Sequence, residues 1–198
     1  MSKLHECKVE HLRPTQITVG MLEVHDKRQH LRELGHHQRR EFLREHAIPA
    51  VLGPNEKLYL TDHHHLGRAL VDENIEHGFF LIEADLSALT DHAAFWLEMN
   101  ARQWAHPVDP QGRRHDCTAI PHHLAELVDD PYRSLAGYVR NAGGYCKTQA
   151  AFAEFQWADF FRRHVTIGAG HAAFAAAVAQ ALALARSPLA QHLPGYGG

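Results

Sequence analysis

One short segment of the sequence gathers most of the side chains that could do chemistry. An aspartate, three successive histidines and an arginine stand close together, at Asp62, His63, His64, His65 and Arg68. A carboxylate can act as a general base, and imidazole and guanidinium groups can donate protons or hydrogen bonds to an anion. The segment therefore predicts a site that binds or reacts with a negatively charged group.

The residues around this segment predict a strand that turns into a helix. Residues 57–61 have the composition of a short strand, and the apolar residues from Leu66 onward recur at helical spacing, with Asp62 in the N-cap position. The amino end of a helix favours anions because it presents backbone N–H groups and the positive end of the helix dipole. We therefore expect a phosphate group at this turn, with Asp62 as base and with His63 and His64 as acids or phosphate donors.

The same residues leave a metal site open. Successive side chains on a helix point about 100° apart, so the three histidines cannot converge on one ion. Asp62 and His64 are the pair that we expect to ligate a divalent metal ion, if one binds. A His/Asp metalloenzyme of other chemistry is therefore an alternative, and a nucleotide is the other cofactor that the site could take.

A second candidate pair, Glu23 and Lys27, lies four positions apart near the N-terminus. On a helix these two residues would form an exposed ion pair of small energetic consequence. In a site they would bring an acid-base group and a phosphate-binding group to the same place. No Walker A, GxGxxG or GxSxG sequence occurs, which excludes the familiar nucleotide-binding and hydrolase loops.

Hydrophobic periodicity and turn residues predict an α+β protein with two parts. The first is a small mixed α/β unit over residues 1–90, and the second is a helical subdomain over residues 91–198 that packs on it. Aspartates at positions 91 and 130 are expected to cap helices. The predicted elements are helices at 36–47, about 63–76, about 149–164 and about 170–186, with strands at 49–52, 57–61 and 79–85.

Composition and charge are those of a soluble globular protein. The chain has 198 residues and a net charge of −3 with neutral histidines, so no global basic field attracts nucleic acid. Five arginines between positions 28 and 44 are interleaved with glutamates, which indicates a solvated helix face. The N-terminus lacks the apolar core of a signal peptide, and the apolar tract at about 172–185 is too short for a membrane span. We expect a cytoplasmic protein without a membrane partner.

Two blocks of the sequence resemble the family of putative ParB-like nucleases, over about residues 10–165. The first block contains Leu12-Arg-Pro-Thr-Gln16, Val19-Gly20, Glu23-Val24, Lys27, Ile48-Pro49, Tyr59 and Asp62-His63-His64. The second contains Asp130-Pro-Tyr-Arg-Ser-Leu-Ala-Gly137, Arg140, Gly143-Gly-Tyr145, Lys147 and Glu154-Phe-Gln-Trp-Ala-Asp-Phe160. The resemblance implies an enzyme that acts at phosphate, by phosphodiester hydrolysis or by nucleotide-dependent phosphotransfer.

The wider superfamily that this family resembles contains the ParB N-terminal domain, sulfiredoxin and ADP-dependent serine kinases. These proteins share a nucleotide-phosphate site at a strand-to-helix turn, and one form of that turn reads Asp-Gly-His-His-Arg. In this sequence His63 stands at the position of the glycine, and Leu66 stands at the position of the arginine. If the alignment is shifted, Arg68 takes the position of the arginine instead.

The resemblance therefore implies a ParB/sulfiredoxin-like α/β unit and a set of supporting residues. Glu23 stands where the serine kinases keep a catalytic acid. The residues expected to bind phosphate or ligand are Lys27, Arg68, Tyr132, Arg133 and Lys147. The expected partner is a phosphate-bearing small molecule or a nucleic acid, and the alternative function is a non-catalytic module that binds DNA or a protein partner.

Overall fold

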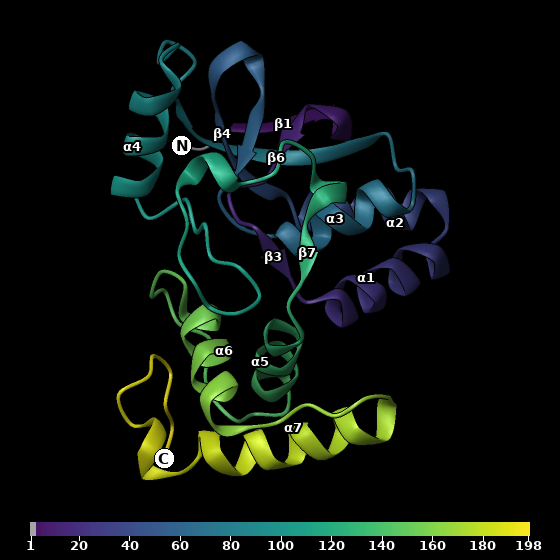
Figure 1. The fold of residues 1–198 in the computed structure, drawn as a ribbon. Coiled ribbons are helices and arrows are strands. Elements are labelled where there is room, and N and C mark those ends of the chain that lie inside the picture. Colours follow the sequence, from purple (N-terminus) through teal and green to yellow (C-terminus); the bar gives the residue numbers. More distant parts are fainter. Residues whose placement is uncertain (1–2) are drawn as a thin grey trace. The chain divides into compact units, whose positions relative to one another are not determined.

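The computed structural model describes residues 3–198 and has the predicted α+β fold (Figure 1). The chain forms two compact units. The first comprises residues 1–19 and 23–128, and the second comprises residues 20–22 and 129–198. Within the described residues, no helix combines the length and the hydrophobicity that crossing a bilayer requires.

Among residues 3–198, the strands and the helices α1 to α4 lie in the first unit, apart from the last residue of β7 and the first residues of α1. Its strands are β1 (Lys3–Lys8), β2 (Leu12–Arg13), β3 (Thr18–Val19), β4 (Ile48–Leu52), β5 (Leu58–Leu60), β6 (His77–Asp85) and β7 (Val128–Asp129), which ends at the boundary. Its helices are α1 (Met21–Glu33), α2 (His36–Glu45), α3 (His64–Asp72) and α4 (His92–Ala101). The first two residues of α1 belong to the second unit.

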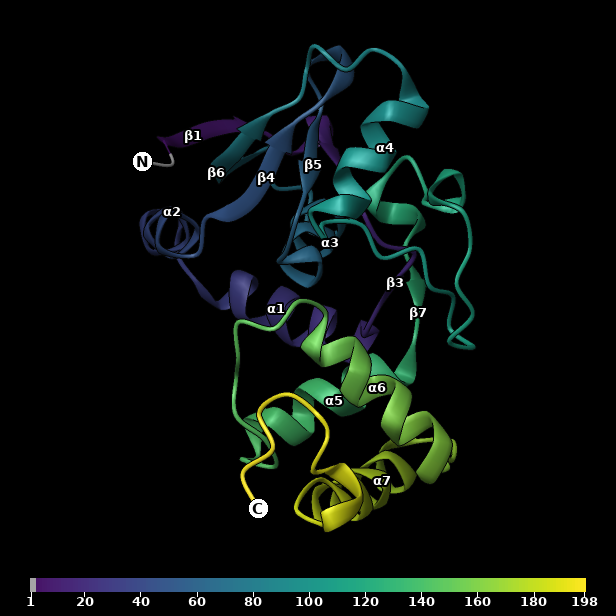
Figure 2. The same ribbon diagram turned by 90° about the vertical axis from the view of Figure 1, so that its left-hand side faces the viewer.

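Five strands form one mixed sheet in the order β1-β6-β4-β5-β2. Figure 2 shows β1, β6, β4 and β5 in this order. The predicted hairpin is present, because β4 and β5 run antiparallel with Ala50 opposite Leu60. β6 runs parallel to β4 and antiparallel to β1, and β2 runs parallel to β5. The neighbours β3 and β7 make a separate two-stranded sheet.

Alternate residues of the central strands contact helices on opposite faces of the sheet. Val51 and Tyr59 pack with Phe95 of α4, and the Tyr59 and Phe95 rings lie 4.5 Å apart between centroids. Leu60, the next residue along β5, faces Gly67 of α3, where an added Cβ would lie 2.8 Å from Leu60 Cδ2. The sheet is therefore covered by α3 on one face and by α4 on the other.

Residues 91–128, which we expected in the helical part, belong to the first unit. The physical reason is the burial of Phe95 and Met99 of α4 against the sheet residue Val51. The apolar residues of α4 could pack against either unit, and the sequence alone does not show which of the two units they contact.

The second unit is a helical bundle formed by α5 (Pro131–Asn141), α6 (Ala153–His164) and α7 (His171–Ala185). Trp157 is fully buried at its centre, stacks on Tyr145 at 4.2 Å, and donates a hydrogen bond from Nε1 to the Pro194 carbonyl at 2.8 Å. Ala177 and Ala181 of α7 also lie in this core. Small side chains on this face allow a close approach between helices, which explains the alanine-rich sequence.

Most predicted elements lie within a few residues of their expected positions. Asp91 and Asp130 are N-caps, since their carboxylates accept from the N–H groups of Ala93 and Tyr132 at 3.0 Å each. The helix expected at 149–164 begins only at residue 153, after Phe152 in a left-handed conformation. The chain also contains short 3-10 helices at Val9–His11, Pro54–Glu56, Cys117–Ala119, Leu124–Glu126 and Pro188–Ala190.

Candidate functional site

The predicted site lies at the turn between β5 and α3. Asp62 is exposed, and its Oδ1 accepts a hydrogen bond from the His63 N–H at 2.7 Å. The expectation that Asp62 is the N-cap is wrong, because the N-cap residue is His63. His63 adopts the left-handed conformation, with φ +59° and ψ +28°. This conformation moves the helix start by one residue and turns the chain sharply from strand into helix.

Only a few residue types adopt a left-handed conformation readily, and glycine does so at no steric cost. His63 stands where the resembling Asp-Gly-His-His-Arg pattern has its glycine. His63 thus adopts, at the position of that glycine, a conformation that glycine adopts at no steric cost. His63 is half-buried, whereas its neighbour Asp62 projects into solvent.

The next two histidines point to different partners, as their helical spacing predicts. His64 is buried and its Nε2 accepts a hydrogen bond from the Thr15 N–H at 3.1 Å. His65 directs its Nε2 toward Glu23 of α1, with 3.7 Å between Nε2 and Oε1. His64 thus joins α3 to the segment before β3, whereas His65 lies against α1.

The proposed metal pair, Asp62 and His64, stays a prediction. The lone pair on His64 Nε2 is used by the Thr15 N–H, and a metal ion could take that nitrogen only by breaking this bond. Oδ1 of Asp62 is likewise engaged by the His63 N–H. These contacts do not favour a metal ion held by both residues.

Glu23 and His65 form a nearly buried acid-imidazole pair. Their side chains are only 10% and 11% exposed. Lys27 lies one turn further along α1 and is half-buried. The sequence pointed to Glu23 and Lys27 but not to His65 as the partner of Glu23, because the two are far apart in sequence and their contact depends on how α1 packs on α3.

Arg68 uses its guanidinium group within the protein. Its Nε donates to Asp72 at 2.8 Å, and Nη1 donates to the carbonyls of Leu127 at 2.9 Å and Leu124 at 3.3 Å. These hydrogen bonds join the segment around the 3-10 helix Leu124–Glu126 to α3. A role for Arg68 in ligand binding stays a prediction, and it would compete with these bonds.

Three of the five arginines of α1 and α2 pair with carboxylates that lie outside these two helices. Arg28 and Arg32 both bind Glu73, at 2.7 and 2.6 Å, and their hydrogen bonds hold the pKa of that carboxyl below its usual value. Arg40 forms a bidentate salt bridge with Glu6, in which Nη1 donates to Oε1 at 2.5 Å and Nη2 donates to Oε2 at 2.7 Å. The guanidinium groups of Arg28, Arg32 and Arg40 therefore carry little unbalanced positive charge.

Three predicted ligand-binding residues lie in the second unit. The Tyr132 hydroxyl donates to the Val165 carbonyl at 2.9 Å. Arg133 is buried beside Glu154, whereas Lys147 is exposed in the connection between α5 and α6. Within this unit the structure does not gather the three around one point, because each has different surroundings.

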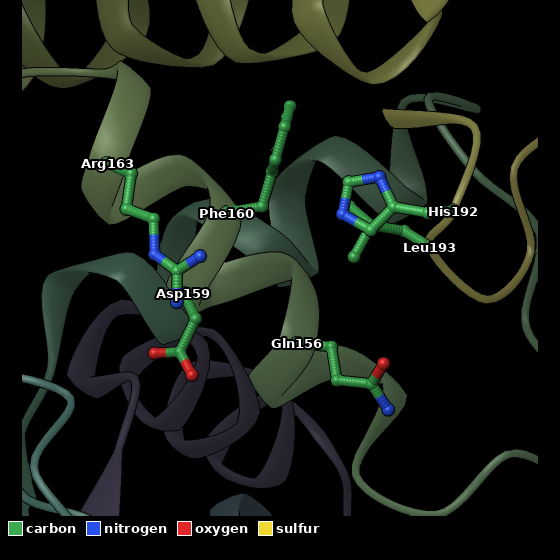
Figure 3. Close-up of a pocket in the computed structure, with 6 residues that line it drawn as sticks. All are labelled: Gln156, Asp159, Phe160, Arg163, His192 and Leu193. Atoms are coloured by element: carbon green, nitrogen blue, oxygen red, sulfur yellow. The ribbon is translucent and has the colours of Figure 1, made fainter. Parts of the chain in front are cut away.

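Two hollows of the surface lie away from the predicted residues. One of about 190 Å³ lies in the second unit and is lined by Gln156, Asp159, Phe160, Arg163, His192 and Leu193 (Figure 3). Another of about 450 Å³ lies in the first unit, between α2, the end of α3 and β6. Neither lining includes a residue predicted for the site.

Comparison with known proteins places the chain in a family. Residues 5–163 match the model of the putative ParB-like nuclease family. The chain belongs to that family. This ParB-like protein is also similar to the crystal structure of protein Atu1540 from Agrobacterium tumefaciens, with a TM-score of 0.91 and 43% identity, over 100% of this chain and 98% of that chain. No curated protein matches the sequence.

Proposed function

We propose that the protein hydrolyses a phosphodiester at the turn between β5 and α3. The observation that carries this proposal is the position of the Asp62 carboxylate and the His63 imidazole at the amino end of α3. Membership of the ParB-like nuclease family supports phosphodiester hydrolysis over phosphotransfer.

The amino end of α3 supplies the phosphate-binding part of the site. The first turn of a helix directs N–H groups outward, and the helix dipole favours an anion at that position. The left-handed backbone at His63 costs a non-glycine residue about 1–3 kcal/mol, and such costs are concentrated at functional turns.

In the proposed reaction, Asp62 is the general base and His63 the general acid. Oδ1 of Asp62 is held by the His63 N–H, which leaves Oδ2 to take a proton from a water molecule. The water oxygen forms a bond to phosphorus while the bond to the leaving oxygen breaks. Protonated His63 gives its proton to that leaving oxygen, so the products are a phosphomonoester and an alcohol.

Glu23, His65 and Lys27 have supporting roles in this proposal. The acid-imidazole contact between Glu23 and His65 holds α1 against the first turn of α3. Lys27, one turn further along α1, adds a positive charge to the same helix. His64 positions the turn through its bond with the Thr15 N–H and is not needed as an acid.

The charge distribution of the first unit bears on the substrate. Because Arg28, Arg32 and Arg40 are neutralised by Glu73 and Glu6, they cannot contact a long run of nucleic-acid phosphates without losing their ion pairs. We therefore propose a substrate that is contacted at few phosphates, such as a short single strand. Its binding would depend only weakly on salt, since few counterions are released.

Replacement of Asp62 by asparagine tests the proposal. The asparagine side chain would keep an oxygen acceptor for the His63 N–H but would not take a proton, so hydrolysis of bis(p-nitrophenyl) phosphate and of a labelled single-stranded oligonucleotide should fall about 10²- to 10⁴-fold. Asp91→Asn is the matched control, because Asp91 is also exposed and also accepts a backbone N–H through Oδ1. Equal rates for Asp62→Asn and wild type would refute the proposal.

A further inference from the structure

The hollow of about 450 Å³ in the first unit is large enough to hold a small molecule, since ligand sites measure roughly 300–1,000 Å³. One of its walls is a single face of α2, whose lining residues recur at helical spacing. These residues are His36, Arg39, Arg40 and Leu43. The rest of the lining includes Glu73, Ile75 and Glu76 from the segment that joins α3 to β6, Phe79 of β6 and Glu6 of β1.

The most deeply buried residues of this lining are apolar. Leu43 and Phe79 are only 5% and 8% exposed, and Ile75 is half-buried. Arg40 lies beside them, with its guanidinium carbon 4.9 Å from the centroid of the Phe79 ring and both terminal nitrogens bound to Glu6. Because its charge is matched, Arg40 offers a flat guanidinium surface, which stacks well on aromatic rings. This part of the hollow therefore suits a flat, largely apolar ring.

Two charged side chains of the lining differ from Arg40, because neither has an ionic partner. Arg39 is half-buried in α2 and Glu76 is exposed before β6, and among residues 3–198 neither side chain makes an ion pair or a hydrogen bond. The helix dipoles add charge of the same sign, since α2 begins beside Arg39 and α3 ends shortly before Glu76. A ligand in the hollow can therefore meet one unmatched positive and one unmatched negative group.

The other acids of the lining are already neutralised. Glu6 pairs with Arg40, and Glu73 pairs with Arg28 and Arg32 of α1. The hollow is therefore not a general cation site or anion site. Its unmatched groups favour a ligand that combines an anionic group with a hydrogen-bond donor.

We infer that this hollow binds an aromatic molecule that carries an anionic group and an amino group on different sides of its ring. Arg39 would donate charge-assisted hydrogen bonds to the anionic group, and the Glu76 carboxylate would accept from the amino group. The ring would stack on Arg40 and cover Leu43. An amino-substituted aromatic acid and an adenine nucleotide share this chemistry. The inference does not rest on the proposed hydrolysis, because no residue of the β5–α3 turn lines the hollow.

Titration of the full chain with 4-aminobenzoate, followed by amide NMR, tests this site. The signals of α2 and of residues 73–79 should shift along a saturable curve, whereas those of the second unit should not move. Benzoate, which lacks the amino group, should bind with a Kd about tenfold higher. Adenosine monophosphate is titrated separately. A lower Kd than that of 4-aminobenzoate would identify a nucleotide as the preferred source of the ring, and a higher Kd an amino aromatic acid.

Two variants assign the two ends of the ligand. Arg39→Gln should raise the Kd of both 4-aminobenzoate and benzoate about tenfold, because both lose the partner of their carboxylate. Glu76→Ala should raise the Kd of 4-aminobenzoate about tenfold but should not raise that of benzoate. Arg44→Gln and Glu45→Ala are the matched controls, because both residues are exposed on α2 outside the lining, and each should leave the Kd within twofold.

The amide spectrum of each variant reports whether it is folded. Absence of shifts in α2 with both 4-aminobenzoate and adenosine monophosphate would overturn the inference. Equal Kd values in Arg39→Gln and Arg44→Gln would overturn it as well. Asp62→Asn separates this site from the proposed function, because it should lose hydrolysis and keep the Kd of 4-aminobenzoate. Normal hydrolysis by Asp62→Asn with binding in the hollow would overturn only the proposed function.

Discussion

Replacement of His64 by leucine tests how the turn between β5 and α3 is held in place. The bond from the Thr15 N–H to His64 Nε2 joins two buried residues, since Thr15 is 1% and His64 4% exposed. Leucine fills similar space but offers no acceptor, so the Thr15 N–H would lose its partner. Leaving one buried donor without a partner costs about 1–3 kcal/mol.

Hydrogen exchange measures this loss at the affected amide. Because 1.4 kcal/mol corresponds to a factor of ten, exchange of the Thr15 amide should be accelerated about 5- to 150-fold in His64→Leu. Peptides from residues 129–198 should exchange at the wild-type rate and serve as an internal control.

His36→Leu is the matched variant, because His36 is the first residue of α2 just as His64 is the first residue of α3, but His36 is exposed. Its effect on stability should stay within about 0.5 kcal/mol. Unchanged exchange at Thr15 in His64→Leu would refute the assignment of His64 as the residue that positions this turn.

Two further predictions concern stability. Asp109 accepts hydrogen bonds from the His115 ring, the Arg113 side chain and the backbone N–H groups of Arg113 and Gln111. These bonds, above all the one from His115, hold the pKa of Asp109 well below the usual value for aspartate. Its contribution to stability is therefore present above about pH 4, the unfolded value, and is lost as the pH falls toward the folded pKa. Between about pH 5 and pH 2 the melting temperature should fall less steeply in Asp109→Asn than in wild type, and parallel curves would contradict this. Gly67→Ala should destabilise the first unit by up to about 2 kcal/mol in urea unfolding. Its Cβ would lie 2.8 Å from Leu60 and 3.3 Å from Leu124, and the cost of this overpacking should exceed the about 1 kcal/mol that alanine gains over glycine in a helix. A variant more stable than wild type would contradict the packing of α3 on the sheet.

Local sequence signals predicted several elements of both units. The β4–β5 hairpin, α2 and the N-caps at Asp91 and Asp130 follow from turn residues, proline positions and capping side chains, all of which act within a few residues. The strand β1 was not predicted. Its pairing with β6 joins residues more than seventy positions apart along much of its length, and its side chains from Leu4 to Lys8 are exposed or half-exposed, so its apolar pattern is weak.

The helix α1 shows a second reason for failure. Only Glu23, Val24 and Leu31 are buried along its thirteen residues, so it lacks the apolar stripe that marks a surface helix. This helix nevertheless carries two of the predicted site residues. The contact between Glu23 and His65 depends on tertiary packing, and no spacing in the sequence reports it.

At the site itself, residue types were easier to predict than backbone geometry. The acid and imidazoles of the β5–α3 turn are visible in the sequence, and the divergence of His64 and His65 follows from helical geometry. The sequence does not predict the shift of the N-cap from Asp62 to His63, because any residue other than glycine is uncommon in the left-handed conformation and aspartate is the stronger N-cap residue.

Incorporation of oxygen-18 from water tests the central claim most directly. Wild-type protein incubated with a short phosphodiester in H₂¹⁸O should place one labelled oxygen on phosphorus, which phosphorus-31 NMR detects as a shifted product signal. Asp62→Asn should produce no labelled phosphate above background. Absence of labelled product from wild type, or equal labelling by Asp62→Asn, would contradict water attack at phosphorus by a base at the β5–α3 turn.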